Sequence, residues 1–424
     1  MTAPDNTDSD SLAGTLGRVT VATIIAAASG YLVLLIAARH LGASGYGVFA
    51  VFWAAYGIVT GAQNGQLQET TRAIRSAQDH RRDALGIDTP ADRPVRINVA
   101  IGFVLAALVA VTAPLWSGSV FDEQRWLSVL LLAGGVASFA VYAHLCGALS
   151  GASRWSAFAV LLSVDALIRL VGAVMSAALG WGLTAFLVIT VAGSASWCVL
   201  LLTSAAARTA VGLPGDANAR RLTTNTLTAM AAALASAVLV MGFPVLIKVT
   251  AGSETFGHAA DDDRLIGAVI LAVTLTRAPL LVPLNSFQGV LISRFVDGRH
   301  AIGRALRGPL AVVATIGVLG SVAAWLIGPW LLTTIFGDDY DLDGAVVGLL
   351  TLGATTLGLL TVTGAATVAA GAHRWYATGW WVATIASALI LLIPADVDTR
   401  SCAALVIGPL AGIAVHVAGL MRRT

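Results

Sequence analysis

Arg277 is the residue in this sequence whose chemistry is hardest to account for by packing alone. It stands near the centre of an apolar stretch, from Arg264 to Arg294, that is long enough to cross a bilayer, which takes about 20 residues. Pro279 and Pro283 follow it in the same stretch. An arginine at mid-membrane costs roughly 2.5–3.5 kcal/mol on insertion scales, so it normally faces a partner or a water-filled cavity. We therefore expect an anionic group opposite Arg277, supplied by the protein or by a substrate.

Uncharged polar side chains accompany this arginine. On an ideal helix, at about 100° per residue, Thr274 and Gln288 share its face and Asn285 lies at the edge. A second amide-rich segment, with Gln63 and Gln66, ends an apolar stretch earlier in the chain. Such amides can bind the hydroxyl groups of a sugar, or they can form hydrogen bonds between helices. The candidate substrate-binding amides are therefore Gln63, Gln66, Asn285 and Gln288.

A carboxylate and a guanidinium stand four residues apart in another apolar stretch, as Asp165 and Arg169. At this spacing they share a helical face and can neutralise each other as an intramembrane ion pair. Two roles stay open: the pair is structural, or Asp165 binds a proton or a sodium ion that is coupled to transport. Asp165 is also one of the groups that could satisfy Arg277, together with carbonyl groups freed by Pro279 and Pro283.

Four further polar residues have a simple explanation beside a functional one. Arg39 and Lys248 end apolar stretches at the predicted outer face, where they are candidates for substrate binding. Long cationic side chains at helix ends also commonly extend toward the lipid headgroups, which requires no substrate. His144 and His416 lie within apolar stretches, and we interpret them as packed, hydrogen-bonded residues.

The elements that must position these residues are transmembrane helices. Hydrophobic residues make up 57% of the 424 residues and charged residues only 11%, whereas soluble domains carry about 25% charged residues. The first apolar run, from about Val19 to Ala38, exceeds the roughly 7–15 residues of a signal-peptide core, so we expect an uncleaved span. The only lysine, Lys248, stands in Leu-Ile-Lys-Val-Thr, which excludes a Walker A loop. The cysteines show no ligand spacing, so we expect neither a metal site nor a cofactor.

We predict an all-α polytopic membrane protein with twelve transmembrane helices. The predicted spans are 17–38, 46–66, 96–115, 127–149, 157–179, 182–203, 225–248, 265–290, 308–331, 345–369, 376–394 and 401–420. With a cytoplasmic N-terminus, most of the 25 Lys and Arg residues lie on the inner side, as the positive-inside bias requires. The outer loops are then acidic, as at Asp261–Asp263. Both termini are therefore predicted to be cytoplasmic.

The sequence also repeats itself. Gly151-Ala-Ser-Arg-Trp155 recurs in the second half as Gly371-Ala-His-Arg-Trp375. Three further matches follow the same order: Gly45-Tyr-Gly47 with Thr255-Phe-Gly257, Gln63, Gln66 and Arg72 with Asn285, Gln288 and Arg294, and Pro114 and Phe121 with Pro329 and Phe336. Six spans is an even number, so the halves share one orientation, and transporters of this kind hold substrate between their halves. The predicted parts are a cytoplasmic tail (1–16), an N-terminal six-helix bundle (17–207), a cytoplasmic linker (208–224) and a C-terminal six-helix bundle (225–424).

Three segments carry a family resemblance. Ala37-Ala-Arg-His-Leu-Gly-Ala-Ser-Gly-Tyr-Gly-Val-Phe-Ala50 resembles the first-loop signature of polysaccharide (O-antigen-type) flippases, roughly Ala-Arg-x-Leu-Gly-x-x-x-Tyr-Gly-x-Phe-Ala. Gly147–Arg154 resembles the glycine-rich end of that family's fourth span, and Phe336–Tyr340 its outer loop between spans 9 and 10. The family belongs to the exporter superfamily that also holds multidrug extruders and lipid II flippases. The lipid II branch has fourteen spans, so the predicted twelve disfavour it.

The resemblance implies that the chain is not an enzyme and moves a lipid-linked oligosaccharide from the inner to the outer leaflet of the cytoplasmic membrane. Arg277 would then meet the pyrophosphate of a polyprenyl carrier, because the planar guanidinium donates two parallel hydrogen bonds to phosphate oxygens. The implied partners are a polysaccharide polymerase and glycosyltransferases, and we expect a monomer. Two alternatives remain. One is a cation-coupled exporter of drugs or small solutes with the same fold; the other is a membrane glycosyltransferase or ligase, which usually has a large outer domain.

Overall fold

The computed structural model of the chain describes residues 6–83, 92–121, 124–251, 263–297 and 302–422, and every regular element within these ranges is a helix. The α-helices are α1 (Asn6–Asp83), α2 (Pro94–Val120), α3 (Arg125–Gly151), α4 (Trp155–Ala178), α5 (Leu183–Ala192), α6 (Ser196–Thr203), α7 (Ala205–Val211), α8 (Ala219–Val240), α9 (Phe243–Thr250), α10 (Asp263–Asp297), α11 (Ile302–Phe336), α12 (Gly344–Ala369), α13 (His373–Leu391) and α14 (Val397–Met421). Two short 3-10 helices are η1 (Gly193–Ala195) and η4 (Asp338–Tyr340). The predicted all-α fold is confirmed.

Ten helices in the described part of the chain are long and apolar enough to cross a membrane, judged by length and composition. The first of them, Val21–Gln78, covers both of the first two predicted spans, because α1 continues through a bend at Gly42. The helix α13 covers the predicted span 376–394 but is not among the ten. The chain is a multi-pass membrane protein, whereas the count of twelve spans and the cytoplasmic position of both termini stay predictions.

Two compact units divide the chain. Unit 1 comprises Met1–Ile36 and Ala55–Ala237, and unit 2 comprises Ala37–Ala54 and Val238–Thr424. The chain therefore passes from one unit to the other inside α8, and the middle of α1 belongs with the C-terminal half. The predicted bundles, with their linker at 208–224, describe the repeat in the sequence, and that division stays a prediction.

In unit 1, α8 lies against α1 at a pair of glycines spaced four residues apart. A Cβ on Gly61 would lie 2.5 Å from the Cβ of Ala237, and a Cβ on Gly65 would overlap the backbone of Met230. Small residues at this spacing let two membrane helices approach closely, because no side chain separates their backbones. These glycines therefore fix α8 to α1.

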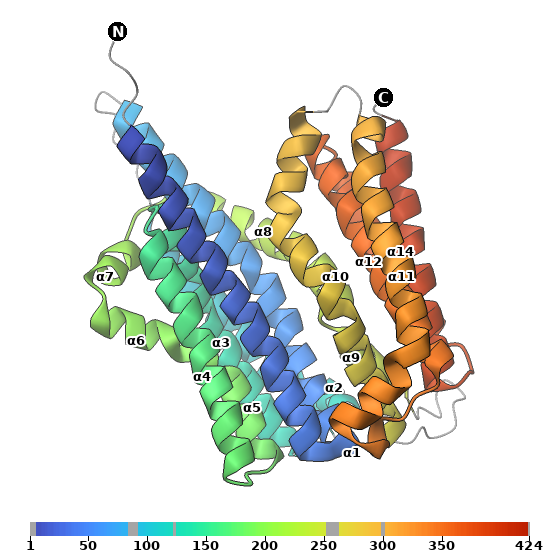
Figure 1. Cartoon of the computed structure of the whole chain (residues 1–424). Helices are drawn as coiled ribbons and strands as arrows, with labels where there is room; N and C mark the ends of the chain where they lie inside the picture. Colours follow the sequence, from blue (N-terminus) through green and yellow to red (C-terminus); the bar gives the residue numbers. More distant parts are fainter. Residues whose placement is uncertain (1–5, 84–91, 122–123, 252–262, 298–301, 423–424) are drawn as a thin grey trace. The chain divides into compact units, whose positions relative to one another are not determined.

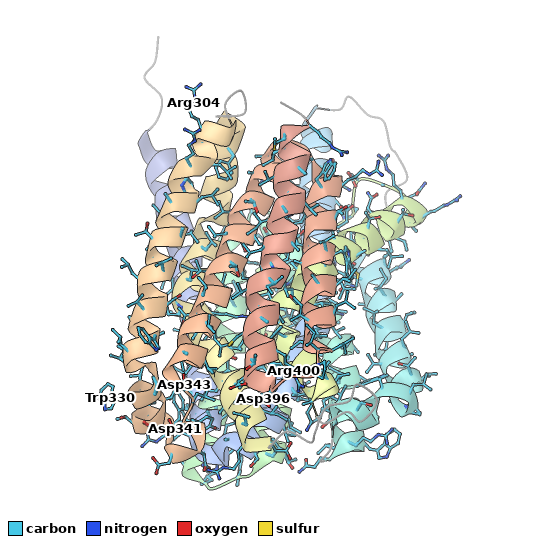
Figure 2. The ribbon with its side chains drawn as sticks, turned by 90° about the vertical axis from the view of Figure 1, so that its right-hand side faces the viewer. Arg304, Trp330, Asp341, Asp343, Asp396 and Arg400 are labelled. Carbon is cyan, nitrogen blue, oxygen red and sulfur yellow. The ribbon has the colours of Figure 1, made fainter. Side chains whose placement is uncertain are left out.

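In unit 2, α12 packs against α10, α11 and α14, and α13 packs against α14. Figure 1 shows α11, α12 and α14 as neighbouring, nearly parallel helices. Figure 2 shows Arg304 at one end of this unit and Asp341, Asp343 and Arg400 at the other. Arg304 therefore lies away from Asp341 and Asp343 within unit 2, while the assignment of these ends to the inner and outer sides stays a prediction.

Two turns, one in each half of the chain, have the same hydrogen-bond pattern. Three backbone N–H groups close each turn. In the first turn, the N–H groups of Ala152, Ser153 and Arg154 donate to the carbonyls of Ala148, Ser150 and Leu149, respectively. In the second turn, the N–H groups of Ala370, Gly371 and Ala372 donate to the carbonyls of Ala366, Val368 and Thr367, respectively. Each turn contains one residue with positive φ, Ser153 at 56° and Gly371 at 67°, as helix C-termini commonly do. The turns lie at the repeated segments Gly151–Trp155 and Gly371–Trp375, but the backbone pattern pairs Ser153 with Gly371, two residues out of register with the sequence match of Gly151 to Gly371.

The segment Ala37–Ala54, which we call the elbow, carries the family-like signature. The helix bends there at Gly42, whose φ of 68° lies in the region that glycine adopts without steric cost. The hydroxyl of Tyr340 donates to the carbonyl of Ala38 in the elbow over 2.8 Å. A Cβ on Gly267 of α10 would overlap the elbow's backbone. The signature residues therefore form a docking segment within unit 2.

Candidate functional site

Arg277 is buried in α10, with 6% of its surface exposed, and it reaches a break between two helices. Its Nη1 donates to the carbonyl of Val240, the last residue of α8, over 2.9 Å. In an unbroken helix this carbonyl would accept from the N–H of residue 244, but Pro244 has no N–H. The guanidinium therefore takes the place of the missing helical hydrogen bond.

An aromatic ring also lies beside this guanidinium. The Cζ of Arg277 lies 5.2 Å from the centroid of the Phe243 ring, which is a cation–π distance. Phe243 is the first residue of α9 and is fully buried. Neither the ring nor the Val240 carbonyl carries a formal charge.

The predicted ion pair is present in α4. Arg169 donates from Nη2 to Oδ1 of Asp165 over 2.8 Å, and both side chains are mostly buried. A helix break again lies beside the arginine, because η1 separates α5 from α6 at this level. A Cβ on Gly193, the first residue of η1, would overlap Nε of Arg169 and nearly overlap Oδ1 of Asp165. The glycine and the break thus provide the space that the pair occupies.

Aromatic residues that the sequence analysis did not single out surround this pair. Tyr56 and Tyr142 lie within electrostatic reach of both Asp165 and Arg169. Phe139 links them, with its ring centroid 6.3 Å from that of Tyr56 and 5.2 Å from that of Tyr142. A tyrosine in an apolar span resembles any core residue, so the sequence alone gave no signal for them.

The amides of α1 form hydrogen bonds between helices, as one of the two sequence-based interpretations predicts. Gln63 donates from Nε2 to the carbonyl of Val136 in α3 over 3.0 Å. Gln66 donates from Nε2 to the carbonyl of Asn98 in α2 over 3.4 Å. Both glutamine side chains are fully buried, and their Oε1 atoms lack a partner among the described residues. Sugar binding by these amides stays a prediction.

His144 is a packed, hydrogen-bonded residue, as we interpret it from the sequence. Its Nε2 lies 3.0 Å from the carbonyl of Val211, so this nitrogen carries the proton and donates. Its Nδ1 then accepts from Nδ2 of Asn98 over 3.1 Å, and Asn98 also donates to Thr70 over 2.7 Å. His416 follows the same scheme, with Nδ1 3.0 Å from Oγ1 of Thr363.

The remaining predicted site residues are scattered. Arg39 is exposed and donates to the carbonyl of Ile335 over 2.7 Å, and Lys248 pairs with Asp263 at 3.3 Å. Asn285 and Gln288 lie in α10, but their side chains are outside the described part of the structure. Among the described residues, no group of three or more His, Cys, Asp or Glu side chains could hold a metal ion.

A charged cluster around Arg72 of α1 lies outside the predicted site. Arg72 pairs with Glu69 at 2.6 Å and with Asp216 at 2.7 Å, and Asn225 of α8 donates to Glu69 over 3.1 Å. Burial raises the pKa of Asp216, but the hydrogen bonds and the charge of Arg72 outweigh it and leave this pKa below its usual value. The cluster therefore ties α1, α8 and the segment before α8 together within unit 1.

Curated relatives match nearly the whole chain. The uncharacterized protein Rv3630 of Mycobacterium tuberculosis is 45% identical over 414 residues, which cover 96% of this chain and 92% of Rv3630. The uncharacterized protein Rv1510 of the same organism is 47% identical over 410 residues, which cover 97% of this chain and 92% of Rv1510. No protein-family model matches the chain.

Solved structures of transporters share the fold. A multidrug resistance MATE family transporter of the MOP superfamily, in an inward-facing conformation, matches with a TM-score of 0.72 and 14% identity, over 95% of this chain and 98% of that one. The lipid II flippase MurJ, in an inward closed conformation, matches with a TM-score of 0.66 and 11% identity, over 96% of this chain and 89% of that one. At such low identities these likenesses establish the fold alone.

Proposed function

Since the chain belongs to the family of membrane proteins that includes Rv3630 and Rv1510 of Mycobacterium tuberculosis, and has the fold of MATE and MurJ transporters, we propose that it is a flippase. It moves a polyprenyl-pyrophosphate-linked oligosaccharide across the cytoplasmic membrane by alternating access, for the synthesis of a surface polysaccharide. It is a transporter and not an enzyme. A polymerase and glycosyltransferases supply and consume the substrate, and the protein works as a monomer.

The observation that carries this proposal is the buried Arg277, bound to a neutral carbonyl and a ring. A carbonyl is a weaker acceptor for a guanidinium than a phosphate, because charge-assisted pairs with an anion are shorter and stronger. A phosphate oxygen that reaches Arg277 can therefore displace the carbonyl of Val240. Two parallel N–H groups of the guanidinium would then hold the pyrophosphate, a geometry that an ammonium group does not offer.

The other candidate residues would bind the sugar part of this substrate or contact it along its path. The unpartnered Oε1 atoms of Gln63 and Gln66 are acceptors for sugar hydroxyls, provided that the substrate reaches the buried face of α1. Asn285 and Gln288 stay candidates for the same role. Arg39 and Lys248 already have protein partners, and we assign them to contacts at the outer end of the substrate path.

The test of the proposal replaces Arg277 in a strain that lacks the chromosomal copy. Arg277→Ala, expressed at the normal level, is expected to abolish surface polysaccharide and to accumulate the lipid-linked precursor in the inner leaflet. Arg277→Lys keeps the charge but loses the bidentate geometry, so partial export is expected. The matched control is Arg264→Ala, which replaces an exposed arginine on the same helix. Normal export by Arg277→Ala would rule out the phosphate-binding role.

A second candidate function is a cation-coupled exporter of drugs or small solutes, which the ion pair Asp165–Arg169 favours. A buried carboxylate with an arginine partner is a group that a proton or a sodium ion can occupy in turn during a transport cycle. Asp165→Asn keeps the shape of the side chain but removes its charge. If Asp165 is the coupling site, transport by Asp165→Asn no longer responds to the ion gradient. If this variant still shows gradient-driven transport at the wild-type rate, Asp165 is excluded as the coupling site.

A further inference from the structure

The break between α8 and α9, which we call the joint, interrupts the helical hydrogen bonds. The helix α8 ends at Val240, α9 begins at Phe243, and Met241 and Gly242 lie between them. Pro244 removes the N–H that would continue the helical hydrogen bonds across this joint, so the carbonyl of Val240 needs another donor. The guanidinium of Arg277 is that donor, from a different helix.

The joint lies within unit 2, just after the point at which the chain leaves unit 1. Unit 1 ends at Ala237 in this part of the chain, and unit 2 begins at Val238. Before the boundary, α8 is fixed to α1 by the contacts of Gly61 and Gly65. After the boundary, α9 packs against α10 and α13. Met241 and Gly242 belong to neither helix, and the carbonyl of Gly242 accepts the first hydrogen bonds of α9, from Val245 and Leu246.

We propose that Arg277 couples anion binding to the release of this joint, an inference that rests on the proposed function. A phosphate that pairs with the guanidinium withdraws the hydrogen bond from Val240 and lifts the cation from the Phe243 ring. The joint then loses two of its contacts with α10, while α9 stays packed against α10 and α13. An anion shifts a conformational equilibrium only if it binds one state better than the other, and here it binds the state in which Arg277 has left Val240.

The geometry also defines a variant that separates capping from anion binding. Pro244→Ala restores an N–H at position 244, which can donate to the carbonyl of Val240 within a continuous helix. Arg277 is then no longer needed at the joint but is still available to an anion. Arg277→Ala removes both functions, and the double variant Arg277→Ala/Pro244→Ala removes anion binding while restoring the helical hydrogen bond.

The experiment measures amide hydrogen exchange at residues 241–246 of the full chain in lipid nanodiscs, with and without inorganic pyrophosphate, and pyrophosphate binding on the same samples. In the wild type we expect binding and a rise in exchange of roughly tenfold, since coupling between sites commonly corresponds to about 5- to 150-fold. Pro244→Ala should bind pyrophosphate at least as tightly, with slow exchange that pyrophosphate does not change. Arg277→Ala should exchange fast without the anion, and the double variant should exchange slowly. The control for proline removal is Pro309→Ala, which replaces a proline within α11.

The outcomes separate this inference from the proposed function. If pyrophosphate binds in an Arg277-dependent way but leaves exchange at the joint unchanged, the coupling is overturned and the phosphate-binding role stands. If the wild type does not bind pyrophosphate, both fall, and fast exchange in Arg277→Ala then marks Arg277 as a structural cap alone. Equal exchange in the wild type and in Arg277→Ala also overturns the coupling, because the arginine then does not hold the joint.

Discussion

Two intramembrane arginines lie beside helix breaks, one in each unit, and they are satisfied in different ways. Arg169 lies beside the 3-10 break of η1 and pairs with a carboxylate on its own helix. Arg277 lies beside the break between α8 and α9, where it binds a carbonyl and an aromatic ring on neighbouring segments. The pair in unit 1 is neutral as a whole, whereas the Val240 carbonyl and the Phe243 ring carry no formal charge.

This difference indicates which arginine suits a transported anion. Replacing Asp165 by a substrate phosphate at Arg169 would leave a buried carboxylate without its partner, which is costly. If a phosphate takes the place of the Val240 carbonyl at Arg277, a neutral carbonyl is left without its donor. The loss of that hydrogen bond costs about 1–3 kcal/mol. The physical comparison therefore favours Arg277 for anion exchange and the Asp165–Arg169 pair for structure or ion coupling.

The largest expected effect comes from breaking the ion pair on one side. Asp165→Ala leaves Arg169 as a buried charge without its carboxylate, so the free energy of unfolding in detergent should fall by roughly 3–5 kcal/mol. Asp165→Leu combined with Arg169→Met replaces both charges with apolar groups and should recover most of this loss. Thermal unfolding of the three proteins is the measurement. A melting temperature of Asp165→Ala equal to that of the wild type would contradict the buried pair.

A somewhat smaller effect is expected from filling the space beside that pair. Gly193→Ala places a methyl group on Nε of Arg169 and against Asp165, and overpacking of this kind costs roughly 2–3 kcal/mol. Gly134→Ala is the matched control, because a Cβ on Gly134 meets no atom within 4 Å. If both variants lose the same stability, the close contact at Gly193 does not hold.

Removing the second arginine should destabilise the protein less than breaking the ion pair. Arg277→Met removes the guanidinium donor of the Val240 carbonyl, a neutral acceptor, so we expect a loss of about 1–2 kcal/mol. Adding Pro244→Ala supplies a backbone donor and should return part of that loss. A larger effect of Arg277→Met than of Asp165→Ala, measured by the same unfolding assay, would reverse the comparison between the two arginines.

The smallest effect concerns a third arginine, Arg72 of α1, which is partly exposed. The pKa of Asp216 is lowered by Arg72 in the folded state, so this interaction stabilises the protein above the pKa of Asp216 in the unfolded chain. The stabilisation is lost as the pH falls below about 4, through the folded-state pKa. For an exposed pair the loss should be less than about 1 kcal/mol. Asp216→Asn should flatten this part of the dependence of unfolding on pH; an unchanged pH profile would exclude the pair as its source.

What the sequence predicts well in this protein is local. Asp165 and Arg169 stand four residues apart on one helix, so their pairing follows from helical geometry without any knowledge of neighbours. The turn at Gly371 is marked by its own glycine, because a helix C-terminus is closed by residues adjacent in the chain and glycine adopts positive φ without steric cost. The helical fold itself follows from hydropathy, since a bilayer requires internally satisfied backbones.

What the sequence does not predict is the register between helices. Pro244 and Arg277 are both conspicuous in the sequence, but only packing of α9 against α10 brings the guanidinium to the one carbonyl that Pro244 leaves without a donor. The role of Gly193 is hidden for the same reason, because its importance depends on the side chains of α4 opposite it. The passage between units inside α8, at Ala237, likewise depends on contacts with α1 that no local pattern specifies.

The docked elbow has a consequence for the order in which the protein assembles. Tyr340 and the Ala38 carbonyl that it binds are 302 residues apart. At a synthesis rate of about 5–20 residues per second, a ribosome needs roughly 15–60 s to make the intervening chain. The helix α1 is therefore made, and enters the membrane, before the residues that finally contact its elbow have been synthesised. Its biogenesis finishes late, when the last third of the chain closes onto a segment made at the beginning.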